Sequence, residues 1–170
     1  VPHTLRNPLY HWTHMELRKP FGIDELLSEK TAEAIYQKAS TMLQNDDFST
    51  RSLLKKANIE VICTTDDPLD ELISHQKVSK DALSFEMRPT WRPDNALKVD
   101  DATHFAAYTK QLEKLTSTVI NDLDDYLVAL EKRHDFFEQS GCKIADCGLS
   151  HLNFVPYNAT QVEAAFNELI

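Results

Sequence analysis

Glycine and cysteine are both scarce in this sequence of 170 residues. The three glycines, Gly22, Gly141 and Gly148, do not form the glycine-rich loops that bind phosphate groups. The three cysteines are too few for a disulfide-stapled secreted fold. Four residues separate Cys142 from Cys147, so the two-residue spacing of a zinc knuckle is missing as well. We therefore expect reduced thiols and a cytoplasmic protein.

Long apolar runs and clusters of basic residues are also missing. No segment has the roughly 20 consecutive apolar residues that a membrane-spanning helix needs. The 27 Asp and Glu residues outnumber the 18 Lys and Arg residues, which gives a formal net charge of -9. Because this charge repels a phosphate backbone, we expect no nucleic-acid partner, and no membrane partner either. A small anionic substrate is compatible with this net charge, since a single arginine can bind it.

The first part of the chain, residues 1–58, has the pattern of a helical subdomain. A short helix over Trp12–Lys19 is predicted to end at Pro20. Apolar residues between Ala32 and Leu43 recur at helical spacing. Ser49 is a predicted cap for a further helix.

The second part, residues 59–170, alternates strands with helices. Three short segments are predicted as strands: Ile59–Thr64, Ser84–Thr90 and Cys142–Ala145. Helices are predicted to begin near Leu69, at Asp100 or Asp101, at Asp122 and at Asn158. Such alternation implies parallel strands joined by right-handed crossovers. The sequence thus predicts an α/β protein, a slice of about three strands from a larger parallel structure, with a large helical insertion.

Polar residues follow each predicted strand, where parallel α/β folds build their active sites. Asp66 and Asp67 follow the first strand, Arg92 and Asp94 the second, and Asp146 the third. An Asp before proline, such as Asp67, is typically a helix cap, and Asp94 lies at a similar turn. Asp66 is open to a functional or a structural interpretation. Arg92 can bind a substrate carboxylate with its forked guanidinium, or it can pair with a neighbouring Asp.

Histidine and cysteine give weaker signals. His11 and His14 could face one metal ion, but no third ligand lies nearby and no HExxH motif exists, which favours packing and hydrogen bonding. Cys147 follows the third strand without a neighbouring base, which argues against a nucleophile. The helical histidines are expected at or near the surface: His75, His104 and His134.

Four motifs in this order resemble those of uronate isomerases. Residues 7–17 and 20–23 are similar to the family's NPLYHWTHLEL and FGI segments. Residues 64–68 read TTDDP, and residues 89–94, PTWRPD, resemble the family pattern P-[ST]-[WF]-R-P-D. Residues 141–146 resemble G-C-[KR]-x-S-D-H, although Ala145 and Cys147 stand where the family has Ser and His.

The resemblance implies an internal fragment of an enzyme of the amidohydrolase superfamily, with a partial distorted (β/α)8 barrel and an inserted helical subdomain. The implied bacterial parent interconverts D-glucuronate with D-fructuronate and D-galacturonate with D-tagaturonate, and we expect it to be a homo-oligomer. Arg92 matches the family arginine that contacts the substrate carboxylate, and Asp66 and Asp146 would line the pocket. Zinc or another divalent metal would bind to an HxH motif and an Asp outside this segment, so no metal is expected within it.

Two other functions are alternatives at this stage. A metal-dependent hydrolase of the same superfamily would need a set of Lys or His residues on strand ends to hold a bridged metal pair. A non-catalytic helical interaction domain would leave an apolar stripe exposed, such as Phe105, Tyr108 and Leu112.

Overall fold

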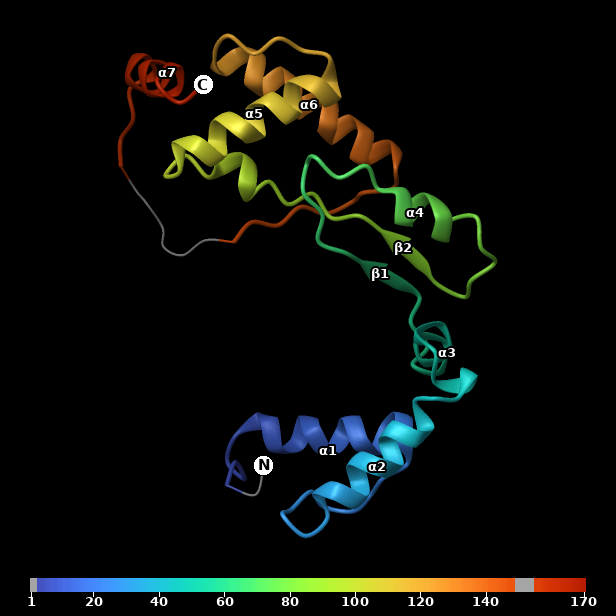
Figure 1. Ribbon diagram of the computed structural model, residues 1–170. Coiled ribbons are helices and arrows are strands. Elements are labelled where there is room, and N and C mark those ends of the chain that lie inside the picture. The colour runs from blue at the N-terminus through green and yellow to red at the C-terminus, as the bar shows by residue number, and fades with distance from the viewer. Residues whose placement is uncertain (1–2, 149–154) are drawn as a thin grey trace. The chain divides into compact units, whose positions relative to one another are not determined.

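The computed structural model describes residues 3–148 and 155–170 (Figure 1). Contacts along the chain divide it into two compact units, Val1–Glu60 and Val61–Ile170. Only helices occur in the described part of the first unit, whereas the second combines helices with a small parallel sheet. Within the described residues, no helix has the length and apolar character needed to cross a bilayer.

The first unit follows the predicted helical pattern. Its elements are α1 (Pro8–Phe21), α2 (Ala32–Met42), the 3-10 turn η1 (Asp46–Phe48) and α3 (Thr50–Lys56). Ser49 caps α3 as predicted, because its hydroxyl accepts the N–H of Ser52. Asn7 caps α1 in the same way by accepting the N–H of Leu9, and Pro8 follows at the first helical position, where no N–H is needed.

Pro20 does not end α1, so the prediction of a stop there was wrong. The helix continues to Phe21 and ends at Gly22, whose φ of 61° is the left-handed conformation that glycine adopts without strain. The Gly22 N–H bonds to the carbonyls of Arg18 and Leu17. Because Pro20 lies in the last turn, its missing N–H removes a single helical bond just before the helix ends.

The second unit contains both strands and the longest helices. Its elements are β1 (Val61–Cys63), α4 (Ile73–Val78), β2 (Glu86–Arg88), the 3-10 turn η2 (Asn95–Leu97), α5 (Ala102–Thr116), α6 (Leu123–Gln139) and α7 (Ala159–Asn167). The predicted caps of the last three helices are confirmed: Asp101, Asp122 and Asn158 each accept a main-chain N–H from the first turn.

β1 and β2 pair in parallel, as predicted, with Val61 opposite Glu86 and Cys63 opposite Arg88. The pairing extends past both strands. Asp66 donates its N–H to the Thr90 carbonyl at 3.2 Å, and Arg92 donates its N–H to the Asp66 carbonyl at 3.1 Å. The carboxyl ends of the two strands are therefore held side by side.

The third predicted strand, Cys142–Ala145, forms one parallel bridge instead of a strand. Ala145 bridges to Trp91, and two main-chain bonds of 3.1 Å join Trp91 to Ile144 and Asp146. Pro89 and Pro93 flank Trp91 and have no N–H, so the ladder cannot lengthen in either direction. The parallel direction is as predicted, but the third segment is a single bridge and not a strand.

The helix predicted near Leu69 begins only at Ile73, because a buried arginine holds the intervening turn. Arg133 of α6 donates from Nε to the Pro68 carbonyl at 2.7 Å and from Nη2 to the Asp70 carbonyl at 2.8 Å. These carbonyls are thereby withdrawn from helical bonding. Leu72 then adopts a left-handed φ of 54° before α4 starts.

The main core of the second unit lies between α5, α6, α7 and η2. Its largest members are aromatic, and Phe105 contacts both Tyr126 and Phe166 at ring distances of 5.3 and 5.7 Å. Tyr108 and Leu112 are also buried there. The apolar stripe that an interaction domain would expose is therefore covered, which argues against that alternative.

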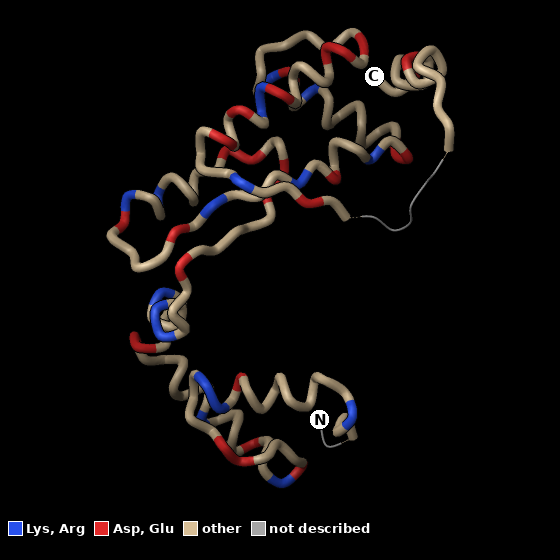
Figure 2. Tube along the Cα trace, turned by 180° about the vertical axis from the view of Figure 1, so that it is seen from behind, with Lys and Arg blue, Asp and Glu red and all other residues tan. Residues whose placement is uncertain are grey.

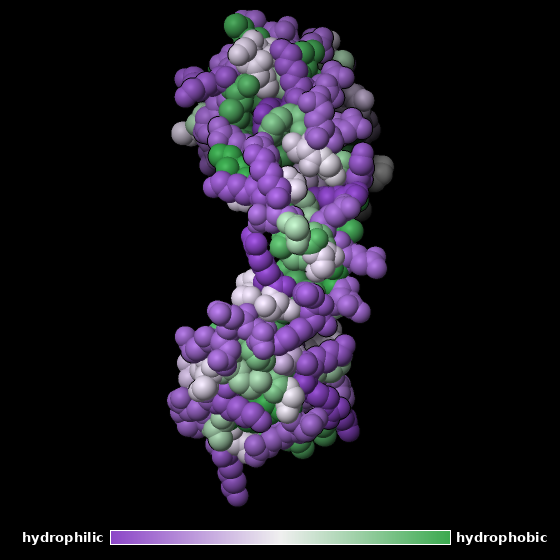
Figure 3. Space-filling model, turned by 90° about the vertical axis from the view of Figure 1, so that its right-hand side faces the viewer, coloured by the Kyte–Doolittle hydropathy of each residue, from purple (hydrophilic) through white to green (hydrophobic). Residues whose placement is uncertain are grey.

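Charges are distributed over the whole chain. Figure 2 shows acidic residues interleaved with basic ones along the described elements, apart from the three basic residues of α3. On the face shown in Figure 3, hydrophilic side chains predominate and apolar ones form small groups between them. Among the described residues, Figure 2 shows no long basic stripe of the kind that nucleic-acid binding uses.

Arg133→Met should lower the free energy of unfolding of the second unit by about 2–4 kcal/mol, because the Pro68 and Asp70 carbonyls lose a charged donor. Urea unfolding followed by the fluorescence of Trp91 measures this, in a Trp12→Phe background that removes the other tryptophan. Lys110→Met, at an exposed position of α5, is the matched control and should change stability by less than about 0.5 kcal/mol. Equal effects of the two substitutions would contradict the assigned role of Arg133.

Candidate functional site

The candidate site lies where the three parallel segments end. The bridges from Asp66 to Trp91 and from Trp91 to Ala145 place residues 66, 92 and 146 on neighbouring segments. We call the group formed by Arg92, Asp94, Asp146 and Gly148 the strand-end cluster. Three members were predicted site or turn residues, and Gly148 is new.

Arg92 is the centre of the strand-end cluster. Its Nε donates to Asp94 Oδ2 at 2.8 Å, and its Nη1 donates to Asp146 Oδ2 at 3.4 Å. The hydrogen bond to Asp94 and the negative charges of Asp94 and Asp146 raise the pKa of Arg92. The side chain is 33% exposed, so the guanidinium is held in place and still reaches solvent.

Asp94 is held by two donors, not one. Besides Arg92, the main-chain N–H of Gly148 donates to Asp94 Oδ1 at 2.9 Å. The Arg92 hydrogen bond and then the Gly148 N–H lower the pKa of Asp94 below its ordinary value. Asp94, which the sequence predicted as a turn residue, is thus an ion-pair partner of Arg92.

Gly148 packs closely against the Arg92–Asp94 pair. A Cβ at this position would lie 3.0 Å from Arg92 Nη2 and 3.0 Å from Asp94 Oδ2, tighter than ordinary van der Waals contact. Sequence reasoning missed this role. The available signal was that one of only three glycines follows the fourth motif, residues 141–146, by two residues.

The cluster can bind an anion through Arg92. Guanidinium offers five N–H donors, and the carboxylates of Asp94 and Asp146 use only some of them. The 3.4 Å bond to Asp146 is long and correspondingly weak. An incoming carboxylate could therefore replace Asp146, while Asp94 keeps the guanidinium oriented.

Asp66 is not part of this open cluster. Its carboxylate is buried, and Oδ2 accepts the hydroxyl of Thr64 at 2.6 Å and the N–H of Thr90 at 3.1 Å. A cavity of about 430 Å³ touches Asp66 and His75, with Asp70 and Glu71 at its wall. Among the described residues, no hydrogen bond joins the Asp66 carboxylate to Arg92.

Asp67 stabilises a turn, not a helix start. Its Oδ1 accepts the N–H of Leu69 at 2.9 Å and the hydroxyl of Tyr108 at 3.0 Å. Its Oδ2 accepts from Asn95 at 2.9 Å. Burial and the neighbouring Asp67 charge raise the pKa of Tyr108, so this phenol stays a donor. Asp67 is therefore structural, as predicted, but it stabilises a turn and does not cap a helix.

His14 and His75 both form hydrogen bonds within the fold. His14 Nδ1 lies 2.7 Å from the Tyr10 carbonyl, and Nε2 accepts the N–H of Leu27 at 3.0 Å, so both ring nitrogens are occupied. This supports the hydrogen-bonding interpretation over metal binding. His75, expected near the surface, is buried against Thr64, and that expectation was wrong.

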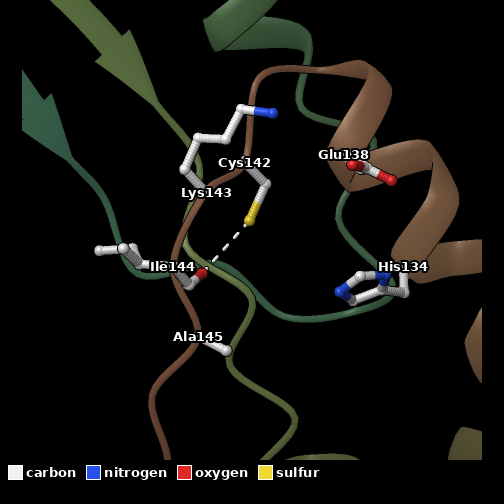
Figure 4. Close-up of a pocket in the computed structure, with 6 residues that line it drawn as sticks. All are labelled: His134, Glu138, Cys142, Lys143, Ile144 and Ala145. Atoms are coloured by element: carbon white, nitrogen blue, oxygen red, sulfur yellow. Dashed lines mark hydrogen bonds between the residues drawn. The ribbon is translucent and has the colours of Figure 1, made fainter.

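A second cavity of about 270 Å³ lies beside residues 142–145 (Figure 4). Its lining includes His134 and Glu138 from α6. The Cys142 thiol donates to the Ile144 carbonyl at 3.3 Å, and His134 packs edge-on against Trp91 at 5.3 Å. These contacts are structural and leave no activated nucleophile pair here.

The described residues do not offer a metal site. Across residues 3–148 and 155–170, no group of three or more His, Cys, Asp or Glu side chains could hold a metal ion. His75 of α4 contacts Thr64, and no Lys or His belongs to the strand-end cluster. The described residues therefore contain no set of ligands for the bridged metal pair that a metal-dependent hydrolase would need.

Comparison with known proteins gives one family over the whole chain. A family model described as glucuronate isomerase matches residues 1–170. The uronate isomerase of Bacteroides thetaiotaomicron is 42% identical over 169 residues, which are 99% of this chain and 36% of that protein. The uronate isomerase of Shouchella clausii is 45% identical over 171 residues, which are 100% of this chain and 36% of that protein. The chain thus spans 36% of the length of these relatives.

Two solved structures share the fold. The uronate isomerase of Thermotoga maritima matches with a TM-score of 0.89 at 30% identity, over 99% of this chain and 37% of that one. The glucuronate isomerase of Caulobacter crescentus matches with a TM-score of 0.83 at 23% identity, over 95% and 34%. The second likeness is evidence for the fold alone.

Arg92→Gln should raise the pKa of Asp94 towards its ordinary value, because it removes the largest cause of the depression. In the wild type, the pair stabilises the fold above the ordinary carboxyl pKa of about 3.9, and this contribution is lost as the pH falls through the folded-state pKa of Asp94. A carbon-detected NMR titration of the carboxyl groups measures the shift.

Asp125 serves as the internal control for this titration. Its pKa is also lowered, but by hydrogen bonds from Asn121, so Arg92→Gln should leave it unchanged. Gly148→Ala should raise the pKa of Asp94 too, because the added Cβ pushes against the pair. An Asp94 titration that is indifferent to both substitutions would show that the cluster does not hold in solution.

Proposed function

The chain belongs to the glucuronate isomerase family, and we propose that it is part of a longer bacterial, cytoplasmic uronate isomerase. The proposed reaction interconverts D-glucuronate with D-fructuronate and D-galacturonate with D-tagaturonate. Because the chain spans 36% of the relatives' length, the reaction belongs to that longer protein. The contribution of this segment is substrate binding.

The observation that carries the proposal is the partly exposed Arg92 at the carboxyl end of parallel strands. A hexuronate carries its carboxylate at one end of the sugar and its reacting carbons at the other. A forked guanidinium binds a carboxylate in one orientation, which would position the remote carbons. Asp94 orients Arg92, and Asp146 occupies a donor that the substrate would take over.

We further propose that the second unit is a section of a distorted (β/α)8 barrel of the amidohydrolase superfamily. The parallel pairing of β1 with β2, and of Trp91 with Ala145, supports a sheet in which consecutive segments are neighbours. Barrels of this kind bind their substrates at the carboxyl ends of the strands. The strand-end cluster lies at that end.

The isomerisation moves a proton between adjacent carbons through an enediol, with general acid and base groups. None of the described residues is assigned to that transfer. A divalent metal such as zinc would polarise substrate oxygens, but the described residues do not fit one, and no step is derived through it.

Arg92→Lys should lower kcat/KM for D-glucuronate at least about tenfold, mainly through KM, because lysine cannot reproduce the forked contact. The experiment uses a chimera in which residues 1–170 replace the matching third of the Bacteroides thetaiotaomicron enzyme, to which they are 42% identical. The unmodified chimera is the reference, and the 170-residue chain alone should give no turnover above the blank.

Arg88→Lys is the matched control, since Arg88 lies on β2 and bonds Glu86 through Nε at 2.8 Å. It should change kcat/KM less than about twofold. Thermal melts accompany both variants. A lower melting temperature for Arg92→Lys with unchanged kinetics of the folded fraction would make Arg92 a structural residue and refute the proposed role.

A further inference from the structure

A partly buried chain of hydrogen bonds runs from α4 to the end of β1. His75 Nε2 lies 2.7 Å from Thr64 Oγ1, and the Thr64 hydroxyl donates to Asp66 Oδ2 at 2.6 Å. Asp66 Oδ2 also accepts the N–H of Thr90 at 3.1 Å. His75 is 8% exposed and Asp66 is 9% exposed, and the cavity of about 430 Å³ that they line contains no member of the strand-end cluster.

The direction of these bonds follows from the proton count. A carboxylate only accepts, so the single Thr64 hydroxyl proton goes to Asp66, and Oγ1 must accept a proton from His75 Nε2. The Arg88 carbonyl is an alternative acceptor for the Thr64 hydroxyl proton, but it lies farther from Oγ1, at 3.3 Å. His75 Nε2 and Asp66 Oδ1 are 3.8 Å apart, too far for a direct hydrogen bond, so the hydroxyl connects them.

This order differs from that of a catalytic triad. In a triad the histidine accepts the hydroxyl proton, which activates the oxygen as a nucleophile. Here the hydroxyl donates a hydrogen bond to the carboxylate and accepts one from the histidine. Thr64 is therefore a structural relay.

The relay ends on the main chain that carries Arg92. The Asp66 carbonyl accepts the Arg92 N–H at 3.1 Å, and the Asp66 N–H donates to the Thr90 carbonyl at 3.2 Å. Residue 66 is thus bound to residues 90 and 92 through its main chain and to residue 90 again through its carboxylate. Pro93 restricts the backbone immediately after Arg92.

We propose that His75 and Thr64 are positioning residues for Arg92. They hold the Asp66 carboxylate, Asp66 holds the main chain of residues 90–92, and that main chain sets where the Arg92 guanidinium points. Neither residue touches the substrate. The consequence for substrate binding rests on the proposed function, whereas the consequence for the main chain does not.

The first arm of the test uses the 170-residue chain and amide hydrogen exchange by NMR. Thr64→Val should speed the exchange of the Thr90 and Arg92 amides at least tenfold and leave the α5 and α6 amides unchanged. Thr64→Ser, which keeps the hydroxyl, should restore protection. Thr109→Val is the matched control, because the Thr109 hydroxyl is buried without a hydrogen-bond partner among the described residues.

The second arm is kinetic and uses the same chimera. Thr64→Val should lower kcat/KM at least fivefold, mainly through KM, when Arg92 is present. In the Arg92→Lys background the same substitution should have almost no further effect, because the residue it positions has been replaced. If Thr64→Val does not fold, His75→Phe gives the same test by removing the donor instead of the hydroxyl.

The outcomes separate the two claims. Unchanged exchange at Thr90 and Arg92, or a kinetic loss equal in both backgrounds, overturns the positioning role. Faster local exchange combined with a harmless Arg92→Lys supports the positioning of the main chain and refutes the proposed function. Faster exchange together with a loss that depends on Arg92 supports both.

Discussion

The buried carboxylate of Asp66 is the constraint on which the strand ends of the second unit depend. Removing an ionised carboxylate from water costs several kcal/mol unless its oxygens are well bonded. Asp66 Oδ2 accepts hydrogen bonds from Thr64 and Thr90, and His75 in turn holds Thr64. Those partners must come together at one point, so β1, β2 and α4 are fixed relative to one another around a single side chain.

A buried cation plays the complementary role on the helical side. Arg133 has few carboxylates to pair with, and it uses the main-chain carbonyls of Pro68 and Asp70 and the ring of Phe136 instead. Burial lowers the pKa of Arg133, but a guanidinium stays protonated at neutral pH. The turn after β1 is thereby tied to α6, and the segment between Asp66 and α4 cannot wind into the helix that its sequence favours.

The strand-end cluster keeps the arginine proposed to bind substrate accessible and oriented at the same time. Asp94 and the Gly148 N–H orient one edge of the guanidinium, while the longer bond to Asp146 leaves the other edge replaceable. Two carboxylates beside one arginine give the strand-end cluster a net negative charge. Substrate binding in the proposed enzyme therefore depends on exchanging one carboxylate for another, and so on geometry more than on net charge.

The sequence by itself determined the features that depend on neighbouring residues. Caps such as Asp101 and Asp122 use atoms three positions away, and β1 is a short apolar segment followed by turn residues. Tertiary structure alone decided the burial of His75, the role of Gly148 beside Asp94, and the delayed start of α4. Each of these depends on contacts between residues 11 to 65 positions apart. Local periodicity and capping rules contain no information about which distant donor will reach a given carbonyl or carboxylate, because packing brings those groups together only in the folded chain.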